Sequence, residues 1–217
     1  LSLFEAEDKN KDQSYFLWRL TQEQLKYCFF PVGGYTKPQI RELAKKYKLP
    51  TAEKDESQGI CFVGKITLFD FLKKHIKPKK GKIIGPDGKV MGWHNGAWFY
   101  TLGQRHGFGG GGGGGKPFYV VKKDVKKNIL YVGYSDDKNL YSKKIEAKNI
   151  NWISDKPKLP LNCLARIRYR QPLQKVKISK IGAKTIISFS KPQFAPVRGQ
   201  SAVFYGGGEM LGGGTIV

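Results

Sequence analysis

In the stretch CLARIRYR, residues 163–170, every second position is apolar and the last three intervening positions are arginine. Successive side chains of a β-strand point to opposite faces, so this pattern predicts a strand with one apolar face and one arginine face. Short β-rich segments separated by Gly, Pro or Asn follow it and predict more strands: QKVKISKIG, TIISFSKP, QSAVFYG and MLGGGTIV. Within residues 140–217 we therefore expect a small closed antiparallel β-barrel or a sandwich.

The three arginines of this stretch, Arg166, Arg168 and Arg170, allow two interpretations. A row of guanidinium groups on one face of a strand fits a phosphate-binding stripe. A solvated outer face of a half-buried strand produces the same pattern. The sequence leaves both interpretations open.

Upstream of the expected barrel, residues 61–135 predict a small, mainly β central domain. TLFDFLKKHI predicts a short amphipathic helix capped by Thr67. GKIIGPDGKVMGW predicts a hairpin that turns at Pro86–Gly88, and KPFYVVKKDVKKNILYVG predicts a second hairpin that turns near residues 124–128. The seven consecutive glycines at 109–115 predict a flexible connection and not a phosphate loop, because no GxxxxGK[ST] pattern occurs in the chain.

Residues 1–60 predict helices. QSYFLWRLTQEQL has helical spacing of its apolar residues, with Asp12 or Ser14 available as a cap, and TKPQIRELAKKYKLP begins with a Thr36–Gln39 capping box. No strand-rich sequence accompanies these helices, so we expect them to be the C-terminal helical part of a domain whose first part lies elsewhere. The expected fold class is α+β multidomain: this helical tail, a central domain and a C-terminal barrel.

The basic charge of the chain is unevenly distributed. The formal net charge is +22; residues 1–60 hold ten Lys/Arg and nine Asp/Glu, whereas the remainder holds 29 and eight. Such a field attracts polyanions, although a lysine-rich surface that only promotes solubility has the same composition. The chain has no apolar run of the roughly 18 residues that span a bilayer, and its first residues lack signal-peptide order. We expect a cytoplasmic protein.

The three cysteines are too few and too widely spaced for a disulfide framework or a zinc site. Cys163 falls on the apolar face of its strand, and Cys28 follows a helix and precedes aromatic residues, so we expect both to be buried. Cys61, in ESQGICFVG, follows a turn-like segment, which favours a reachable thiol whose thiolate Lys54 and Lys65 would support. Burial remains the alternative for Cys61 on residue type alone.

Six motifs carry a resemblance that covers nearly the whole chain. In order they are NKDQSYFLWRL, ESQGICFVG, GKIIGPDGKVMGWHNGAWFYTLGQRHGFG, PFYVVKKDVKKNILYVG, RIRYRQ and RGQSAVFYGGGEMLGGGTI. They resemble, in the same order, the motifs of bacterial tRNA-specific 2-thiouridylases, the MnmA/TrmU family. The resemblance implies an ATP-binding PP-loop domain, a small central domain and a β-barrel. It also implies synthesis of 2-thiouridine at the wobble position of tRNAs for Glu, Gln and Lys.

The resemblance further implies roles for individual residues. Cys61 aligns with the cysteine that carries the persulfide sulfur, after ATP and Mg²⁺ have served to adenylate the base. The implied partners are tRNA and a sulfur-donor protein such as a cysteine desulfurase or relay protein, and the implied enzyme is a monomer. The positions that match tRNA contacts of the family are Lys11, Asp12, Gln13, Arg168, Tyr169 and Gln200. Arg168 and Tyr169 would reach one RNA only if the strand is bulged or ends there.

The chain also departs from the family pattern. The PP-loop signature SGGxDS is absent, as is the second catalytic cysteine with its nearby Asp, and Cys28 follows KDQSYFL where the family cysteine precedes it. We therefore expect a fragment that is inactive alone: residues 1–60 from the PP-loop domain, 61–135 from the central domain and 140–217 from the barrel. A non-catalytic RNA-binding barrel with an inert Cys61 is the main alternative. A thiol redox protein is a weaker one, since no resolving cysteine lies nearby in the sequence.

Overall fold

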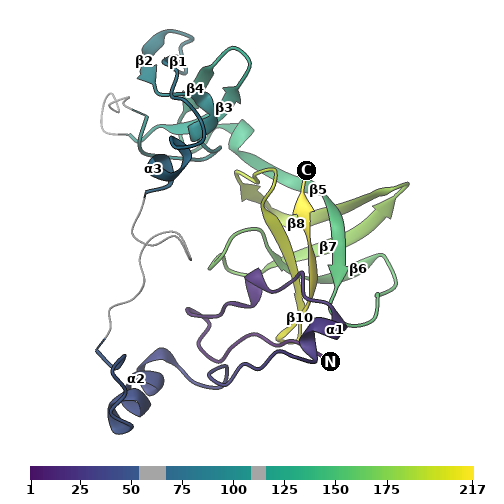
Figure 1. Ribbon diagram of the computed structural model, residues 1–217. Coiled ribbons are helices and arrows are strands. Elements are labelled where there is room, and N and C mark those ends of the chain that lie inside the picture. The colour runs from purple at the N-terminus through teal and green to yellow at the C-terminus, as the bar shows by residue number, and fades with distance from the viewer. Residues whose placement is uncertain (54–66, 109–115) are drawn as a thin grey trace. The chain divides into compact units, whose positions relative to one another are not determined.

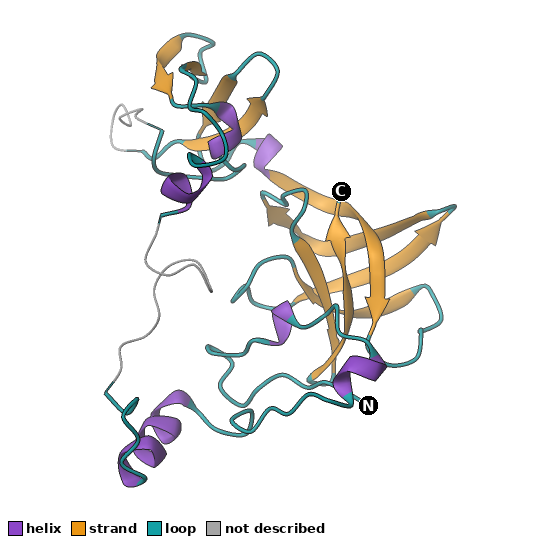
Figure 2. Cartoon of the chain, viewed as in Figure 1, coloured by secondary structure: helices purple, strands orange, loops and turns teal. Residues whose placement is uncertain are grey.

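The computed structural model describes residues 1–53, 67–108 and 116–217, and these form two compact units. One unit combines Leu1–Lys54 with Lys143–Val217, and the other is drawn from Asp55–Ser142. Strands dominate both units (Figure 2). Every helix in the described part of the chain is too short or too polar to span a membrane.

The first unit contains a closed six-stranded barrel, which confirms the expected barrel (Figure 1). The order around the barrel is β10-β5-β8-β7-β6-β9. Its interior is filled by apolar side chains of all these strands, among them the fully buried Ile178, Ile187 and Phe204. The strands are β5 (Tyr141–Trp152), β6 (Leu161–Arg166), β7 (Gln174–Ile181), β8 (Lys184–Phe194), β9 (Ser201–Gly206) and β10 (Glu209–Ile216).

Two features of the barrel differ from the sequence expectation. Strand β5 was not expected, because YSKKIEAKNINW is mostly polar and only Ile145 and Ala147 are buried along it. The strict alternation of residues 163–170 predicted one continuous strand, and this was wrong: β6 ends at Arg166, and the chain bends at 167–170. Arg170 there has a positive φ of 63°, a conformation uncommon for residues other than glycine and typical of turns.

The N-terminal segment lies along the outside of the barrel. The expected helix over QSYFLWRLTQEQL was wrong: the segment forms only a 3-10 turn, η1 (Ser14–Phe16), and one short helix, α1 (Gln22–Leu25). Tertiary contacts outweigh helical spacing here, because the Trp18 indole donates to Ser201 Oγ at 2.8 Å. A Cβ on Gly213 would lie 2.9 Å from the Trp18 ring, so the glycine run of β10 admits this tryptophan.

The second cluster of buried apolar residues lies between this segment and the outer side of the barrel strands. It unites Leu3, Tyr15, Trp18 and Leu25 of the segment with barrel residues that include Val203 and Met210. Helix α2 (Lys37–Lys46) follows and has the expected capping box, in which Gln39 Oε1 accepts from the Thr36 N–H at 2.7 Å. No residue of α2 is buried.

The other unit contains a four-stranded sheet of order β2-β1-β4-β3. Its strands are β1 (Gly81–Ile84), β2 (Val90–His94), β3 (Tyr119–Asp124) and β4 (Ile129–Gly133), and both expected hairpins are confirmed. Strands β1 and β4 pair in parallel. Helix α3 (Leu68–Leu72) begins as expected at Thr67, whose Oγ1 accepts from the Asp70 N–H at 3.0 Å. Two 3-10 turns, η2 (Ala97–Phe99) and η4 (Lys138–Leu140), complete the unit's regular structure as described.

Candidate nucleic-acid interface

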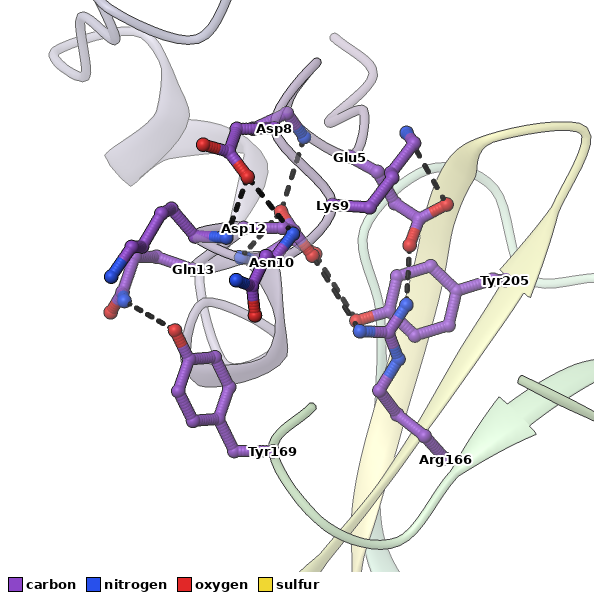
Figure 3. A network of polar contacts seen from close by, with 12 residues as sticks. Glu5, Asp8, Lys9, Asn10, Asp12, Gln13, Arg166, Tyr169 and Tyr205 are labelled. Carbon is purple, nitrogen blue, oxygen red and sulfur yellow. Dashed lines mark hydrogen bonds and ion pairs between the residues drawn. The ribbon is translucent and has the colours of Figure 1, made fainter. Parts of the chain in front are cut away.

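A buried carboxylate, Asp12, organises the loop that precedes η1 (Figure 3). Its Oδ1 accepts from the N–H groups of Ala6 and Ser14, both at 3.1 Å, and its Oδ2 accepts from Ser14 Oγ at 2.7 Å. Ser14 Oγ in turn lies 3.1 Å from the hydroxyl of Tyr205 on β9. Burial raises the pKa of Tyr205 to about 12, so the phenol stays neutral at physiological pH. These bonds join the loop to the barrel wall.

Arg166, at the end of β6, forms the charged part of the same network (Figure 3). Its guanidinium pairs with the Glu5 carboxylate and lies 3.8 Å from Asp12 Oδ2, and all three side chains are at least nine-tenths buried. The guanidinium carbon also lies 4.6 Å from the centre of the Tyr205 ring. Neither a phosphate-binding stripe nor a solvated face therefore describes Arg166, because the N-terminal segment covers this face of β6.

Asp8 orders the turn that carries Lys11. Its side chain accepts from the N–H groups of Lys37, Asn10 and Lys11 at 3.0, 3.0 and 3.2 Å. The bond from Lys37, with those from Lys11 and Asn10, holds the pKa of Asp8 below its usual range. Lys11 is half-buried on this turn.

Gln13 and Tyr169, which are 156 positions apart in the sequence, meet at the exposed edge of the network (Figure 3). Gln13 Nε2 donates to the Tyr169 hydroxyl at 2.8 Å. The Tyr169 ring lies 4.8 Å from the ring of Phe16, which is 56% exposed, and 5.1 Å from the guanidinium carbon of Arg170. An amide, two aromatic rings and a cation are thus presented together.

Tyr15 connects the three segments that hold the expected site residues. Its buried hydroxyl lies 3.3 Å from the Ile167 carbonyl and 3.0 Å from the Ser201 carbonyl, and it donates toward both. Ile167 precedes Arg168 in the chain, and Ser201 follows Gln200. Burial raises the pKa of Tyr15, which keeps its proton available for these bonds. Through this hydroxyl the structure brings the neighbourhoods of Gln13, Arg168 and Gln200 together.

Arg168 and Gln200 are both half-buried at this junction. Arg168 donates to the Ala195 carbonyl at 2.8 Å and lies 5.6 Å from the Phe194 ring centre, and burial lowers its pKa. Gln200 Oε1 is buried and has no hydrogen-bond partner among the described residues. An unpaired amide oxygen is costly, so it is a candidate acceptor for a ligand that approaches here.

Sequence reasoning missed some members of this site. Phe16 was assigned to a helix, and nothing local in the sequence indicates that Tyr15 bridges the bend after β6 and the start of β9. Arg170 stood in the arginine row, but its place beside Tyr169 depends on the turn that ends β6. Strand β6 ends at Arg166. The side chains of Arg168 and Tyr169 therefore need not point to opposite faces, which is the condition for both to reach one RNA.

The cysteines divide into one that the structure does not describe and two that it does. Cys61, the expected persulfide carrier, lies outside the described residues, as does the Gly109–Gly115 run. Cys28 and Cys163 are half-buried, so the expectation of full burial was wrong in degree. Cys28 packs against the cluster that includes Trp18, and its Sγ donates to the Gln24 carbonyl at 3.3 Å. Cys163 packs against the barrel core, and burial raises its pKa to about 12.

No cluster of three His, Cys, Asp or Glu residues suited to a metal occurs among the residues described.

Three family models match the chain in succession. They are the tRNA methyl transferase HUP domain over residues 1–65, the tRNA methyl transferase PRC-barrel domain over 69–134, and the aminomethyltransferase beta-barrel domain over 142–216. Together they extend over nearly the whole chain.

Curated relatives are similar over the same range. A tRNA-specific 2-thiouridylase MnmA of Streptococcus thermophilus (strain CNRZ 1066) is 44% identical over 214 residues, which are 96% of this chain and 57% of the relative. The Streptococcus mutans protein of the same name is 45% identical over 216 residues, with the same coverage. The Coxiella burnetii protein is 45% identical over 221 residues, 99% of this chain and 59% of the relative. The chain thus spans less than two thirds of the length of these relatives.

We expect Arg166→Met to destabilise the barrel unit by about 3–5 kcal/mol, because it leaves the buried carboxylates of Glu5 and Asp12 without their cation. Arg170→Ala, which removes an exposed arginine from the adjoining turn, is the matched control and should change stability by less than about 0.5 kcal/mol. Urea unfolding measures both. The double variant Glu5→Gln/Arg166→Met should lose less free energy of unfolding than Arg166→Met alone. Equal stability of Arg166→Met and the wild type would contradict a structural role for the pair.

Cys163 should be the slowest of the three thiols to react with iodoacetamide at pH 8. Its pKa of about 12 means that the reactive thiolate is scarce until the pH approaches that value. Its labelling rate should keep rising between pH 9 and 11, where an ordinary thiol is already ionised. Peptide mass spectrometry after timed labelling measures each site, and denatured protein, in which all three should react alike, is the control. Faster labelling of Cys163 than of Cys61 would count against both assignments.

Proposed function

The chain belongs to the tRNA-specific 2-thiouridylase family, and on that premise we propose that it is the tRNA-binding and sulfur-carrying portion of such an enzyme. The proposed substrate is the wobble uridine of tRNAs for Glu, Gln and Lys, and the product is 2-thiouridine. We assign residues 1–60 to the nucleotide-binding domain, 61–135 to the central domain and 140–217 to the barrel. The enzyme would act in the cytoplasm as a monomer that receives sulfur from a cysteine desulfurase or relay protein.

The convergence around the Tyr15 hydroxyl is the observation that carries this proposal. Residues 13, 168 and 200 come from three distant parts of the sequence, and the carbonyls beside two of them accept from that one hydroxyl. The exposed edge offers the donor and acceptor groups of an amide, two neighbouring aromatic rings and an arginine. Unpaired RNA bases are recognised by such rings, and phosphates by such arginines.

The proposed contacts divide into groups that face RNA and a group that positions them. Gln13 and Tyr169 would contact a base or sugar, while Lys11 and Arg168 would contact phosphate. Gln200 would use its unpaired amide oxygen to accept from the RNA. Asp12 is 2% exposed and accepts three hydrogen bonds from its own loop, so we assign it the role of orienting Lys11 and Gln13 rather than direct contact.

Cys61 would carry the sulfur as a persulfide. Its terminal sulfur forms a bond with C2 of the adenylated uridine, the C2–O bond breaks, and AMP leaves. A second thiol then attacks the Cys61 sulfur, so the S–S bond breaks, a protein disulfide forms, and the thiolated base is released. A persulfide is a polarizable nucleophile suited to the first of these steps. We assign the second thiol to neither Cys28 nor Cys163.

ATP and Mg²⁺ enter the proposal through the family alone. The chain contains neither SGGxDS nor GxxxxGK[ST], and the described residues include no acidic cluster suited to a metal. The residues present therefore do not fit a nucleotide site by themselves, and no step through the nucleotide is assigned to them.

The 217-residue chain should bind tRNA, with an affinity that falls steeply as salt rises, by roughly 0.7–0.9 log units per tenfold salt for each phosphate contacted. Tyr169→Ala should weaken binding by about 1–3 kcal/mol through loss of stacking. Tyr47→Ala is the control, since Tyr47, which follows the end of α2, is 66% exposed and lies outside the proposed site. Filter binding at several salt concentrations measures all three proteins. Absence of tRNA affinity at low salt would refute the proposal.

In the full-length protein, Cys61→Ser should abolish 2-thiouridine formation and leave tRNA binding intact, because serine cannot carry a persulfide. Nucleoside analysis of tRNA by mass spectrometry measures thiolation, and filter binding measures affinity. Cys163→Ala, which removes the thiol with the raised pKa, is the control and should retain thiolation. Full thiolation by Cys61→Ser would refute the sulfur-carrier role and favour an inert Cys61. Binding of tRNA without any thiolation by the full-length wild type would favour the rival function, a non-catalytic RNA-binding barrel.

A further inference from the structure

The sheet of the second unit has one buried face and one open face. Ile83, Leu130 and Val120 of adjacent strands are fully buried on the inner face. The register places Lys82 opposite both Trp93 and Ile129, and Tyr131 opposite Lys122. On β1, β2 and β4 these partners alternate with the buried residues. On β3 the register shifts between Val120 and Lys122, which brings Lys122 to the side of Tyr131, so the partners share the outer face.

Two aromatic rings on this outer face lie under lysine ammonium groups. Lys80 Nζ lies 4.9 Å from the centre of the Trp93 ring, and Lys122 Nζ lies 5.3 Å from the centre of the Tyr131 ring. Trp93 is 50% exposed, a large fraction for a tryptophan on a paired strand. The face therefore presents flat rings and positive charges side by side at two places on one sheet.

The loop that carries Lys80 is held in place from beneath. Asn128, which is buried and has a positive φ of 57°, donates from Nδ2 to the carbonyls of Lys79 and Lys80 at 3.0 and 3.1 Å. Its Oδ1 accepts from the Ala97 N–H at 2.9 Å. The side-chain amide of one buried residue thus fixes the backbone from which the Lys80 side chain extends toward Trp93.

The charge of this unit favours a polyanionic partner. Residues 67–108 and 116–142 hold fourteen Lys/Arg and five Asp/Glu. Asp124 lies in the same row of the sheet as Lys82, but its Oδ1 accepts from the Lys127 N–H at 2.9 Å and so serves the hairpin turn. Lys80, Lys82 and Lys122 outnumber this one carboxylate, so the outer face keeps a net positive charge around its rings.

We propose that this face, defined by Lys80, Lys82, Trp93, Lys122 and Tyr131, is a second RNA-contacting surface that binds an unpaired segment of the tRNA substrate. The inference rests on the proposed function. Bases would stack on Trp93 and Tyr131, and the lysines would contact the adjoining phosphates. An acidic protein would use the lysines alone, whereas the paired rings match the flat faces of bases.

Binding of tRNA by variants of the whole chain tests the surface. Trp93→Ala should weaken binding about 10-fold, and Trp93→Phe, which keeps a ring, should retain most of the affinity. Lys80→Gln/Lys82→Gln should weaken binding. It should also lower the slope of log affinity against log salt by the amount expected for about one to two phosphate contacts. Lys126→Gln/Lys127→Gln removes the same charge from the hairpin turn of this unit and should leave the salt dependence unchanged. Thermal unfolding of each variant verifies that the fold is retained.

The outcomes separate this inference from the proposed function. If the wild type binds tRNA and Tyr169→Ala weakens it, but Trp93→Ala and Lys80→Gln/Lys82→Gln behave like the hairpin control, the second surface is refuted and the barrel site stands. That result would favour an acidic protein as the partner of the lysines. If the wild type does not bind tRNA at low salt, both proposals fall together.

Discussion

The buried ion pair of Arg166 with Glu5 and Asp12 is the constraint on which the rest of the barrel unit depends. Removing three charged groups from water is expensive unless each is paired, and here the pairing joins a barrel strand to a loop more than 150 positions away. A loop in any other position would leave an isolated charge in an apolar setting. The pair therefore selects one placement of the N-terminal segment, and the hydrogen bonds of Asp12 and Tyr15 refine it.

Much of the fold could be predicted from the sequence, because it depends on local signals such as turn and capping residues. Both hairpins of the second unit follow from turn residues between β-rich runs, and the starts of α2 and α3 follow from the capping residues Thr36 and Thr67. Strand β5 was missed because its outward residues are lysines and its inward ones are few. The helix expected around Phe16 failed because partners far along the chain, above all Ser201, offered better bonds than a helix would.

The residues of the candidate site could be predicted from the sequence only through the family resemblance. The family resemblance named its residues, but no pattern in the sequence indicated that a tyrosine hydroxyl unites their backbones or that Asp12 faces inward. Alternation along residues 163–170 placed Arg166 with Arg168 and Arg170, three residues that the structure gives three environments: a buried ion pair, a half-buried carbonyl contact and an exposed turn. Sequence periodicity identifies which residues share a face of a strand. It does not indicate that the distant N-terminal segment covers part of that face.

The distribution of acids explains how one protein keeps both a folded interface and a basic surface. Among the acids within residues 1–60, Glu5 and Asp12 pair with the buried Arg166, and Asp8 and Asp12 accept hydrogen bonds that order the loop beside it. They neutralise the single barrel arginine that must be buried and add no negative charge where Tyr169 and Arg170 are exposed. The positive field of the remaining chain is therefore left to act on polyanions. A field alone selects no particular RNA, so selectivity must come from the rings and amides that these internal bonds hold in position.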